Sequence, residues 1–167
     1  MGAERQGPGG AAGAALISDA GPGDAEELRT LFREYSASLG DQGCFPDFEA
    51  ELAALPGGYA VLLVARIDSE TVGCAALQRL PDGACEMKRL YVRSSARSSG
   101  TGRLLVETLI ARARDLGHGV MRLDTLPTMD AARAIYLSLG FRPIERYNDN
   151  PIPGVLFFEL RLGAPRQ

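Results

Sequence analysis

The sequence predicts a mixed α/β (α+β) fold, in which a central, largely antiparallel twisted sheet of about six to seven strands is flanked by about four helices. Two observations predict it. Short apolar runs typical of strands alternate with segments whose apolar residues recur at helical spacing. Three of the strand-like runs also follow one another directly, with only turn residues between them, which is typical of an antiparallel meander.

Eleven elements are predicted along the chain. In order they are a strand at 15–17, a helix beginning after Asp24, a shorter helix at 47–55, strands at 59–67, 71–80 and 84–92, a helix at 102–116, a strand at 120–124, a helix at 130–139, and strands at 141–144 and 155–162.

In the first half, breakers and caps mark where elements begin and end. Gly21-Pro22-Gly23 ends the first strand, and Asp24 with Glu27 predicts a capping box at the start of the first helix. The stretch 40–46, which contains Gly and Pro, ends this helix. Pro81-Asp82-Gly83 is the turn between the second and third meander strands.

In the second half, apolar residues spaced four apart from 105 to 113 lie on one helical face, and Gly117 is placed to end that helix. Gly140 ends the next amphipathic helix in the same way. Two apolar runs then close the sheet.

Length and composition predict one domain. The chain has 167 residues, 46% of them apolar and 23% charged, which is ordinary for a globular protein. We expect residues 1–14, rich in Gly and Ala, to be a disordered tail and residues 15–163 to be the domain. No apolar run approaches the ~20 residues that span a bilayer, so we expect no membrane partner. The cysteine usage described next leads us to expect a cytoplasmic location.

Charge and cysteine usage narrow the possible functions. A formal net charge of −3 argues against a protein that binds nucleic acid through bulk attraction to phosphate. Cys44, Cys74 and Cys85 have neither metal-ligand nor CxxC spacing, so we expect reduced, structural thiols and no metal.

A glycine-rich segment separates a predicted strand from a predicted helix: Arg97-Ser98-Ser99-Gly100-Thr101-Gly102-Arg103. Glycines at such a turn let backbone N–H groups approach an anion, and the helix N-terminus adds about half a positive charge. A P-loop would need Lys and Ser/Thr at the positions of Arg103 and Leu104, and a dinucleotide-binding motif would need a third glycine at the position of Leu105. Neither nucleotide-binding motif is therefore present in this segment. A pyrophosphate cradle and a simple Gly/Ser turn remain.

The surroundings of this loop carry a family resemblance. The R-x-x-G-x-G string follows the strand KRLYV, and AIYLSLGF lies downstream. With the element order over about residues 15–162, these strings resemble the GNAT N-acetyltransferase superfamily. In that family the strand before the loop is bulged and splays from its neighbour, and the pantetheine arm of coenzyme A pairs with it. The resemblance implies acetyl-CoA as co-substrate and no metal.

The resemblance also implies which residues bind the coenzyme. The pantetheine arm would pair with Leu90 and Val92, whose alternative role is plain core strand. The pyrophosphate would be held by backbone N–H groups of Arg97, Ser98, Ser99, Gly100, Thr101, Gly102 and Arg103. The guanidinium groups of Arg93, Arg97 and Arg103 would counter the anionic charge.

Three positions are implied to carry chemistry. Glu86 matches the general base of the histone-modifying branch, and its alternative is an exposed carboxylate paired with Lys88 or Arg89. The Leu90 N–H matches the oxyanion donor. Tyr136, in the string A-x-x-x-Y-x-x-x-G-F, matches the general acid, and its alternative is a tyrosine packed against the sheet.

The sequence constrains the acceptor less. The loops at 40–47 and 147–154 would border it, with Asp41, Asp47 and Asp149 as candidates for attracting a cationic amine and Phe45 and Tyr147 as candidate walls.

Three further residues are predicted to have no role in chemistry. His118 in its Gly-His-Gly turn is expected to be solvated, Asp124 to cap a turn, and Cys85 to be a packed thiol.

The predicted function is transfer of an acetyl group from acetyl-CoA to a small-molecule or peptide amine by direct attack. The alternative is a non-catalytic acyl-CoA-binding module that regulates a partner, and acylation of a hydroxyl also remains open. The resemblance to the family also implies that the protein forms a homodimer.

Overall fold

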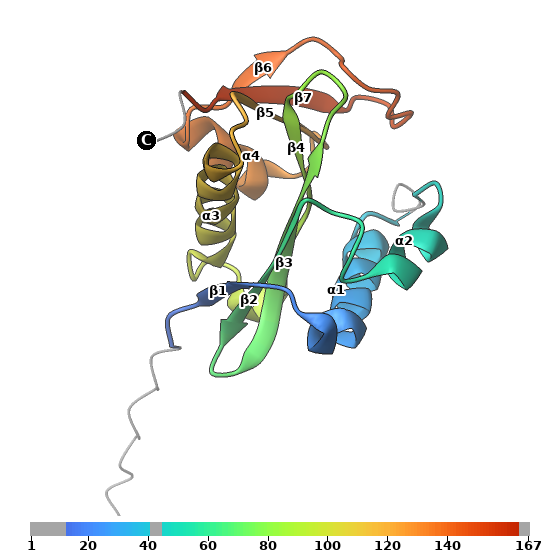
Figure 1. Ribbon diagram of the computed structural model, residues 1–167, viewed down its shortest axis with the longest axis vertical. Coiled ribbons are helices and arrows are strands. Elements are labelled where there is room, and N and C mark those ends of the chain that lie inside the picture. Colours follow the sequence, from blue (N-terminus) through green and yellow to red (C-terminus); the bar gives the residue numbers. More distant parts are fainter. Residues whose placement is uncertain (1–12, 41–44, 164–167) are drawn as a thin grey trace, which may run out of the picture.

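The computed structural model describes residues 13–40 and 45–163, so most of the expected tail, Asp41 and Cys44 lie outside the described residues. Within them, a seven-stranded sheet has the order β1-β2-β3-β4-β5-β7-β6. Helices α1 and α2 cover one face and α3 and α4 the other (Figure 1). The predicted fold class, the strand number and the element order are confirmed.

The bounds differ from the predicted ones by one or two residues at most ends. The elements are β1 (Leu16–Asp19), α1 (Ala25–Ser38), α2 (Phe48–Ala54), β2 (Val61–Ile67), β3 (Glu70–Arg79), β4 (Cys85–Val92), α3 (Thr101–Asp115), β5 (Val120–Thr125), α4 (Asp130–Ser138), β6 (Arg142–Ile144) and β7 (Leu156–Arg161). Single turns of 3-10 helix lie at Pro22–Asp24 and Ser94–Ala96.

The sheet consists of two antiparallel parts. Strands β1 to β4 pair antiparallel in chain order, which confirms the predicted meander, and β7 pairs antiparallel with both β5 and β6. The two parts join through one parallel pairing, between β4 and β5. This junction is the feature of the fold that matters most for the site.

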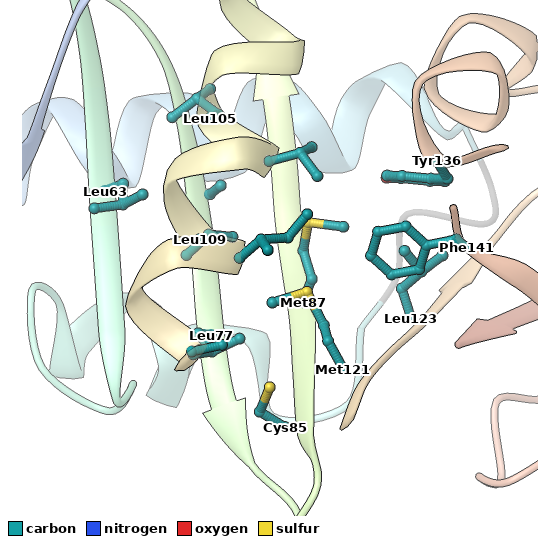
Figure 2. Packing of buried hydrophobic residues seen from close by; sticks show 14 of the residues in the cluster. Leu63, Leu77, Cys85, Met87, Leu105, Leu109, Met121, Leu123, Tyr136 and Phe141 are labelled. Atoms are coloured by element: carbon teal, nitrogen blue, oxygen red, sulfur yellow. The ribbon is translucent and has the colours of Figure 1, made fainter. Parts of the chain in front are cut away.

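Both faces of the central strands are buried. Along β2, Leu63 and Ala65 pack into the cluster under α3, while Leu62 and Val64 pack into the cluster under α1 and α2. Because helices cover both faces, the strand is a continuous apolar run and not an alternating one. Figure 2 shows the cluster on the α3 side, with Leu109 of that helix above the strands.

Two local predictions were wrong. Asp24 does not cap α1, because its carboxylate accepts the Gly21 N–H (2.8 Å) and closes the preceding turn, while also pairing with Arg66. His118 is buried, since the turn after α3 packs against the β3–β4 turn, where Nδ1 lies 2.9 Å from the Gly83 carbonyl oxygen.

Candidate active site

A β-bulge interrupts β4 immediately after its first half. Cys74 of β3 lies opposite Tyr91 and Ala76 lies opposite Lys88, so β4 holds one more residue than β3 between these pairs. Arg89 sits in the bulge with a left-handed backbone, φ 57°. The extra residue changes which face the following side chains occupy, and Leu90 consequently packs toward the α3 side.

The bulge is held from the α2 side by an ion pair. The Arg89 guanidinium donates to both carboxylate oxygens of Glu51, each at 2.9 Å, and Tyr59 donates its hydroxyl to the same carboxylate. The guanidinium also lies over the Phe45 ring, 4.0 Å from its centroid. A left-handed non-glycine residue costs roughly 1–2 kcal/mol, and these contacts offset that strain.

Beyond Glu86, β4 separates from β5. The two strands pair only at Cys85 with Met121 and at Glu86 with Arg122. From residue 87 onward, β4 has ladder partners only in β3 within the described residues. Leu90 and Val92 therefore lie on a stretch of strand whose β5 side is not paired to another strand, so an extended amide chain has room to pair there.

The strand leads into the glycine-rich loop, whose backbone forms an anion-binding geometry. Ser98 and Gly100 both have left-handed backbones, φ 69° and 82°. The first intrahelical bond of α3 runs from the Leu104 N–H to the Gly100 carbonyl (3.0 Å). The N–H groups of Thr101, Gly102 and Arg103 precede it and have no acceptor within the helix. Such free donors at a helix N-terminus fit a pyrophosphate.

The side chains of the loop make hydrogen bonds and an ion pair with residues close in sequence. The hydroxyls of Ser99 and Thr101 lie 2.6 Å apart, and Thr101 is buried. Arg97 is exposed and donates back to the Val92 carbonyl (3.0 Å). Arg103, also exposed, pairs with Glu107 (2.9 Å).

Arg93 does not point its charge at the loop. It donates to both oxygens of Glu34, each at 3.0 Å, and pairs with Glu27 at 2.8 Å. Both carboxylates belong to α1, so the expected role of Arg93 toward the coenzyme is not supported by these contacts.

Glu86 is buried, with 4% of its surface exposed, and each of its oxygens is engaged. Oε2 accepts the Tyr147 hydroxyl (2.5 Å) and the Asn148 amide (3.4 Å). Oε1 accepts the Gln78 amide (2.8 Å) and lies 3.7 Å from Lys88 Nζ. The alternative of an exposed strand carboxylate is therefore wrong in its exposure, although the pairing with Lys88 is present.

The network around Glu86 extends to a second carboxylate. Asn148 also donates to Asp124 Oδ2 (2.8 Å), and Asn150 donates to the same oxygen (3.2 Å). Asp124 is thus a partner in this network and not a turn cap. Burial, the bond to Glu86 and the Glu86 charge all raise the pKa of Tyr147, which keeps its hydroxyl protonated.

Tyr136 is buried on α4 beside Phe141, with ring centroids 5.6 Å apart (Figure 2). Burial raises the pKa of its hydroxyl. Within residues 13–40 and 45–163 no side chain hydrogen-bonds this hydroxyl. It is packed against the core, as the alternative held, and the raised pKa keeps its hydroxyl protonated.

A cavity of about 280 Å³ lies on the α2 side of β4. It is lined by Pro46, Glu51, Ala54, Gly57, Gly58, Tyr59, Gln78, Lys88 and Arg89. Two of these residues, Gln78 and Lys88, also contact Glu86, so the cavity adjoins the buried carboxylate.

The residues predicted to border the acceptor amine have partly different roles in the structure. Tyr147 was expected as a wall and instead bonds Glu86, whereas Phe45 stacks on Tyr35 (5.9 Å) and lies under Arg89. Asp149 is exposed. The roles of Gln78 and Asn148 were not expected. The run Asn-Asp-Asn-Pro at 148–151 is typical of turns in which Asn and Asp side chains bond the backbone. No local pattern, however, indicates that Asn148 would bond Glu86, 62 residues away.

The burial of the cysteines agrees with their expected structural role. Cys74 and Cys85 are buried free thiols, and burial raises the pKa of each to about 12. Among the described residues no cluster of three or more His, Cys, Asp or Glu side chains could hold a metal ion. None of the described helices is long and apolar enough to cross a membrane.

A bulged strand that opens from its parallel neighbour and leads into an anion-binding helix start defines an acyl-coenzyme A-dependent transferase class. Comparison with known proteins agrees with this class. The model of the acetyltransferase (GNAT) family matches residues 25–141. An uncharacterized N-acetyltransferase of Schizosaccharomyces pombe is 38% identical over 147 residues, covering 84% of this chain and 90% of the relative.

Solved structures share the fold. A GNAT-family acetyltransferase of Staphylococcus aureus Mu50 is 20% identical and superposes with a TM-score of 0.77, covering 90% of this chain and 100% of its own. The yncA protein of Salmonella typhimurium, solved with its cofactor acetyl-CoA, is 22% identical with a TM-score of 0.72, covering 92% and 98%. The chain belongs to the GNAT family and is an acetyl-CoA-dependent acyltransferase.

Proposed function

We propose that the protein transfers the acetyl group of acetyl-CoA to an amine by direct attack, with Glu86 as the general base. The observation that carries this proposal is the position of Glu86. It is a buried carboxylate at the last paired residue of β4, directly before the strand opens from β5 and next to the cavity. A buried carboxylate that adjoins a cavity with other polar groups is a candidate for a functional site.

The coenzyme is proposed to bind along the open stretch of β4 and the following loop. Leu90 and Val92 would pair with its pantetheine amides, and the backbone N–H groups of residues 97–103 would hold its pyrophosphate. The two left-handed loop residues and the helix-start donors without intrahelical acceptors support this assignment, because such turns and helix N-termini are common anion-binding arrangements.

The chemistry assigns one task to each remaining group. The amine attacks only as the free base, so its proton passes to Glu86, directly or through water. The Leu90 N–H would donate to the oxygen that gains charge, a contact whose loss costs on the order of 10²–10³ in rate. The thiolate that leaves would take the Tyr136 proton, although burial raises the pKa of that hydroxyl and makes it a weaker acid.

The acceptor is proposed to be a small-molecule or peptide amine entering from the α2 side. The cavity of about 280 Å³ is near the lower end of typical small-ligand sites, which supports a small acceptor group. The domain limits 15–163, a homodimer and a cytoplasmic location stay predictions.

Coenzyme binding and chemistry are tested separately. Excess acetyl-CoA at 100 times its Kd should add about 2.7 kcal/mol of stability and raise the Tm by roughly 5–11 °C, while ATP and NAD should not. Transfer is then followed as released thiol with amino acids, polyamines and short peptides as acceptors.

The base is tested with Glu86→Gln against the matched control Glu145→Gln, an exposed glutamate outside the site. The first variant should lower kcat by about 10²-fold or more with an unchanged acetyl-CoA shift, and the control should change neither. Unchanged turnover in Glu86→Gln would remove it from the chemistry. Coenzyme binding without transfer to any amine would favour the regulatory module.

A further inference from the structure

Lys88 is the one lysine in the sequence, and it lies beside the carboxylate proposed as the base. Its Nζ is 3.7 Å from Glu86 Oε1, and its side chain is 32% exposed. It also lines the cavity on the α2 side of β4. A primary amine, the chemical group that the proposed reaction consumes, is therefore built into the wall of the site.

The Lys88 ammonium is less constrained than its neighbour. The adjacent Arg89 is fixed by two bonds to Glu51, whereas the 3.7 Å contact with Glu86 is longer than a hydrogen bond. Nζ makes no hydrogen bond and no second ion pair within the part of the chain that the structure describes, although the Lys88 charge also acts on the nearby Glu51 carboxylate. The flexible four-carbon stem is thus free to reorient without breaking a hydrogen bond.

The place where the thioester would lie is within reach of this side chain. The Leu90 N–H, proposed to bind the thioester oxygen, is two residues further along the same strand. Two residues span at most roughly 7 Å even when fully extended, and the left-handed Arg89 between Lys88 and Leu90 shortens this separation. A lysine side chain turned along the strand covers that distance.

We propose that Lys88 is an internal acetyl acceptor, which the protein acetylates from its own bound acetyl-CoA. The inference rests on the proposed function, since it uses the same coenzyme site and the same base. The ammonium first loses a proton through Glu86 to solvent. The neutral nitrogen then bonds to the thioester carbon, the C–S bond breaks, and the second nitrogen proton leaves while the sulfur is protonated to the thiol.

Acetylation would change the cavity that the external amine is proposed to enter. It removes the Lys88 charge and adds bulk at the wall. The remaining cationic wall residue, Arg89, is already neutralised by Glu51. Acetylation would therefore remove the cation that pairs with Glu86, so self-acetylation would alter the charge that an entering amine meets.

The test incubates the purified chain with acetyl-CoA and follows intact mass and peptide maps over time. The expected result is addition of one acetyl group at Lys88, at a first-order rate that does not depend on protein concentration. Lys88→Arg should abolish that signal, and excess CoA should suppress it by occupying the coenzyme site. Glu86→Gln should slow it by about 10²-fold, with Glu145→Gln as the unchanged control.

Each other outcome overturns the inference. Acetylation that excess CoA does not suppress is solution chemistry, and a rate that rises with protein concentration is transfer between molecules. If external amines are acetylated while Lys88 stays unmodified, the inference fails and the proposed function stands. If acetyl-CoA neither binds nor acetylates any amine, both fail.

Discussion

Replacing Glu51 with glutamine removes the charge that holds the β4 bulge. The Arg89 and Glu51 side chains are 11% and 17% exposed and meet through two 2.9 Å bonds, so the substitution leaves Arg89 with little compensating solvent. Breaking one partner of a buried pair costs 3–5 kcal/mol, and the remaining exposure favours the lower end. We expect about 3 kcal/mol, or a Tm lower by roughly 6–12 °C.

The assay is chemical and thermal unfolding of a double-mutant cycle made of Glu51→Gln, Arg89→Gln and the pair. If the ion pair is the source of the effect, the double variant loses less than the sum of the single variants, with a coupling of roughly 1–3 kcal/mol. Additive losses, or a single-variant loss below about 1 kcal/mol, would show that the bulge does not depend on this pair.

Three further predictions concern the sheet and its buried groups. Gly73→Ala places a methyl group 2.7 Å from the Tyr91 carbonyl oxygen and should cost about 1–3 kcal/mol in unfolding experiments, whereas Gly23→Ala, with nothing within 4 Å, should not. Burial raises the pKa of Cys85 to about 12, so iodoacetamide labelling seen by mass spectrometry should await unfolding. Burial raises the pKa of Glu51, but the hydrogen bonds from Arg89 and Tyr59 and the charges of Arg89 and Lys88 together outweigh it, and the net pKa lies below the ordinary 4.5. The stability gap between the wild type and Glu51→Gln should therefore be full above pH 4.5 and close as the pH falls through the folded-state value.

The sequence predicts the elements well because the signals that set them are local. Helical spacing, glycine stops and the turn at 81–83 act within a few residues, and each predicted strand and helix is present. His118 was misplaced because its burial depends on a contact with Gly83, 35 residues earlier. A Gly-His-Gly turn has no local signal for such a contact.

The candidate site also has a part that local sequence signals predict and a part that they do not. The glycine-rich turn between a strand and a helix is readable from the sequence, and in the structure Ser98 and Gly100 of this turn have left-handed backbones. The partners of Glu86 are not local, since Tyr147 and Asn148 lie 61 and 62 residues away and reach it only because β7 pairs beside β5. Pairing of strands distant in sequence is decided by the whole sheet, so single-sequence patterns do not specify it.

The bulge itself gives a sharper test of how packing and site are linked. In a regular strand, Leu90 would share a face with Glu86 and Lys88, because side chains alternate. The extra residue sends Leu90 and Val92 to the α3 cluster and Tyr91 to the α1 cluster. Arg89→Gly and deletion of Arg89 both remove the ion pair, but only the deletion reverses these faces.

We expect Arg89→Gly to fold with reduced stability and to keep its thermal shift with acetyl-CoA, since glycine adopts φ 57° without strain and the bulge persists. The deletion variant should be less stable by at least a further ~3 kcal/mol, because three partly buried apolar side chains would face the wrong layer, and it should lose the shift. A deletion variant as stable as Arg89→Gly, with the shift intact, would show that neither the packing of β4 nor the opening toward β5 requires the extra residue.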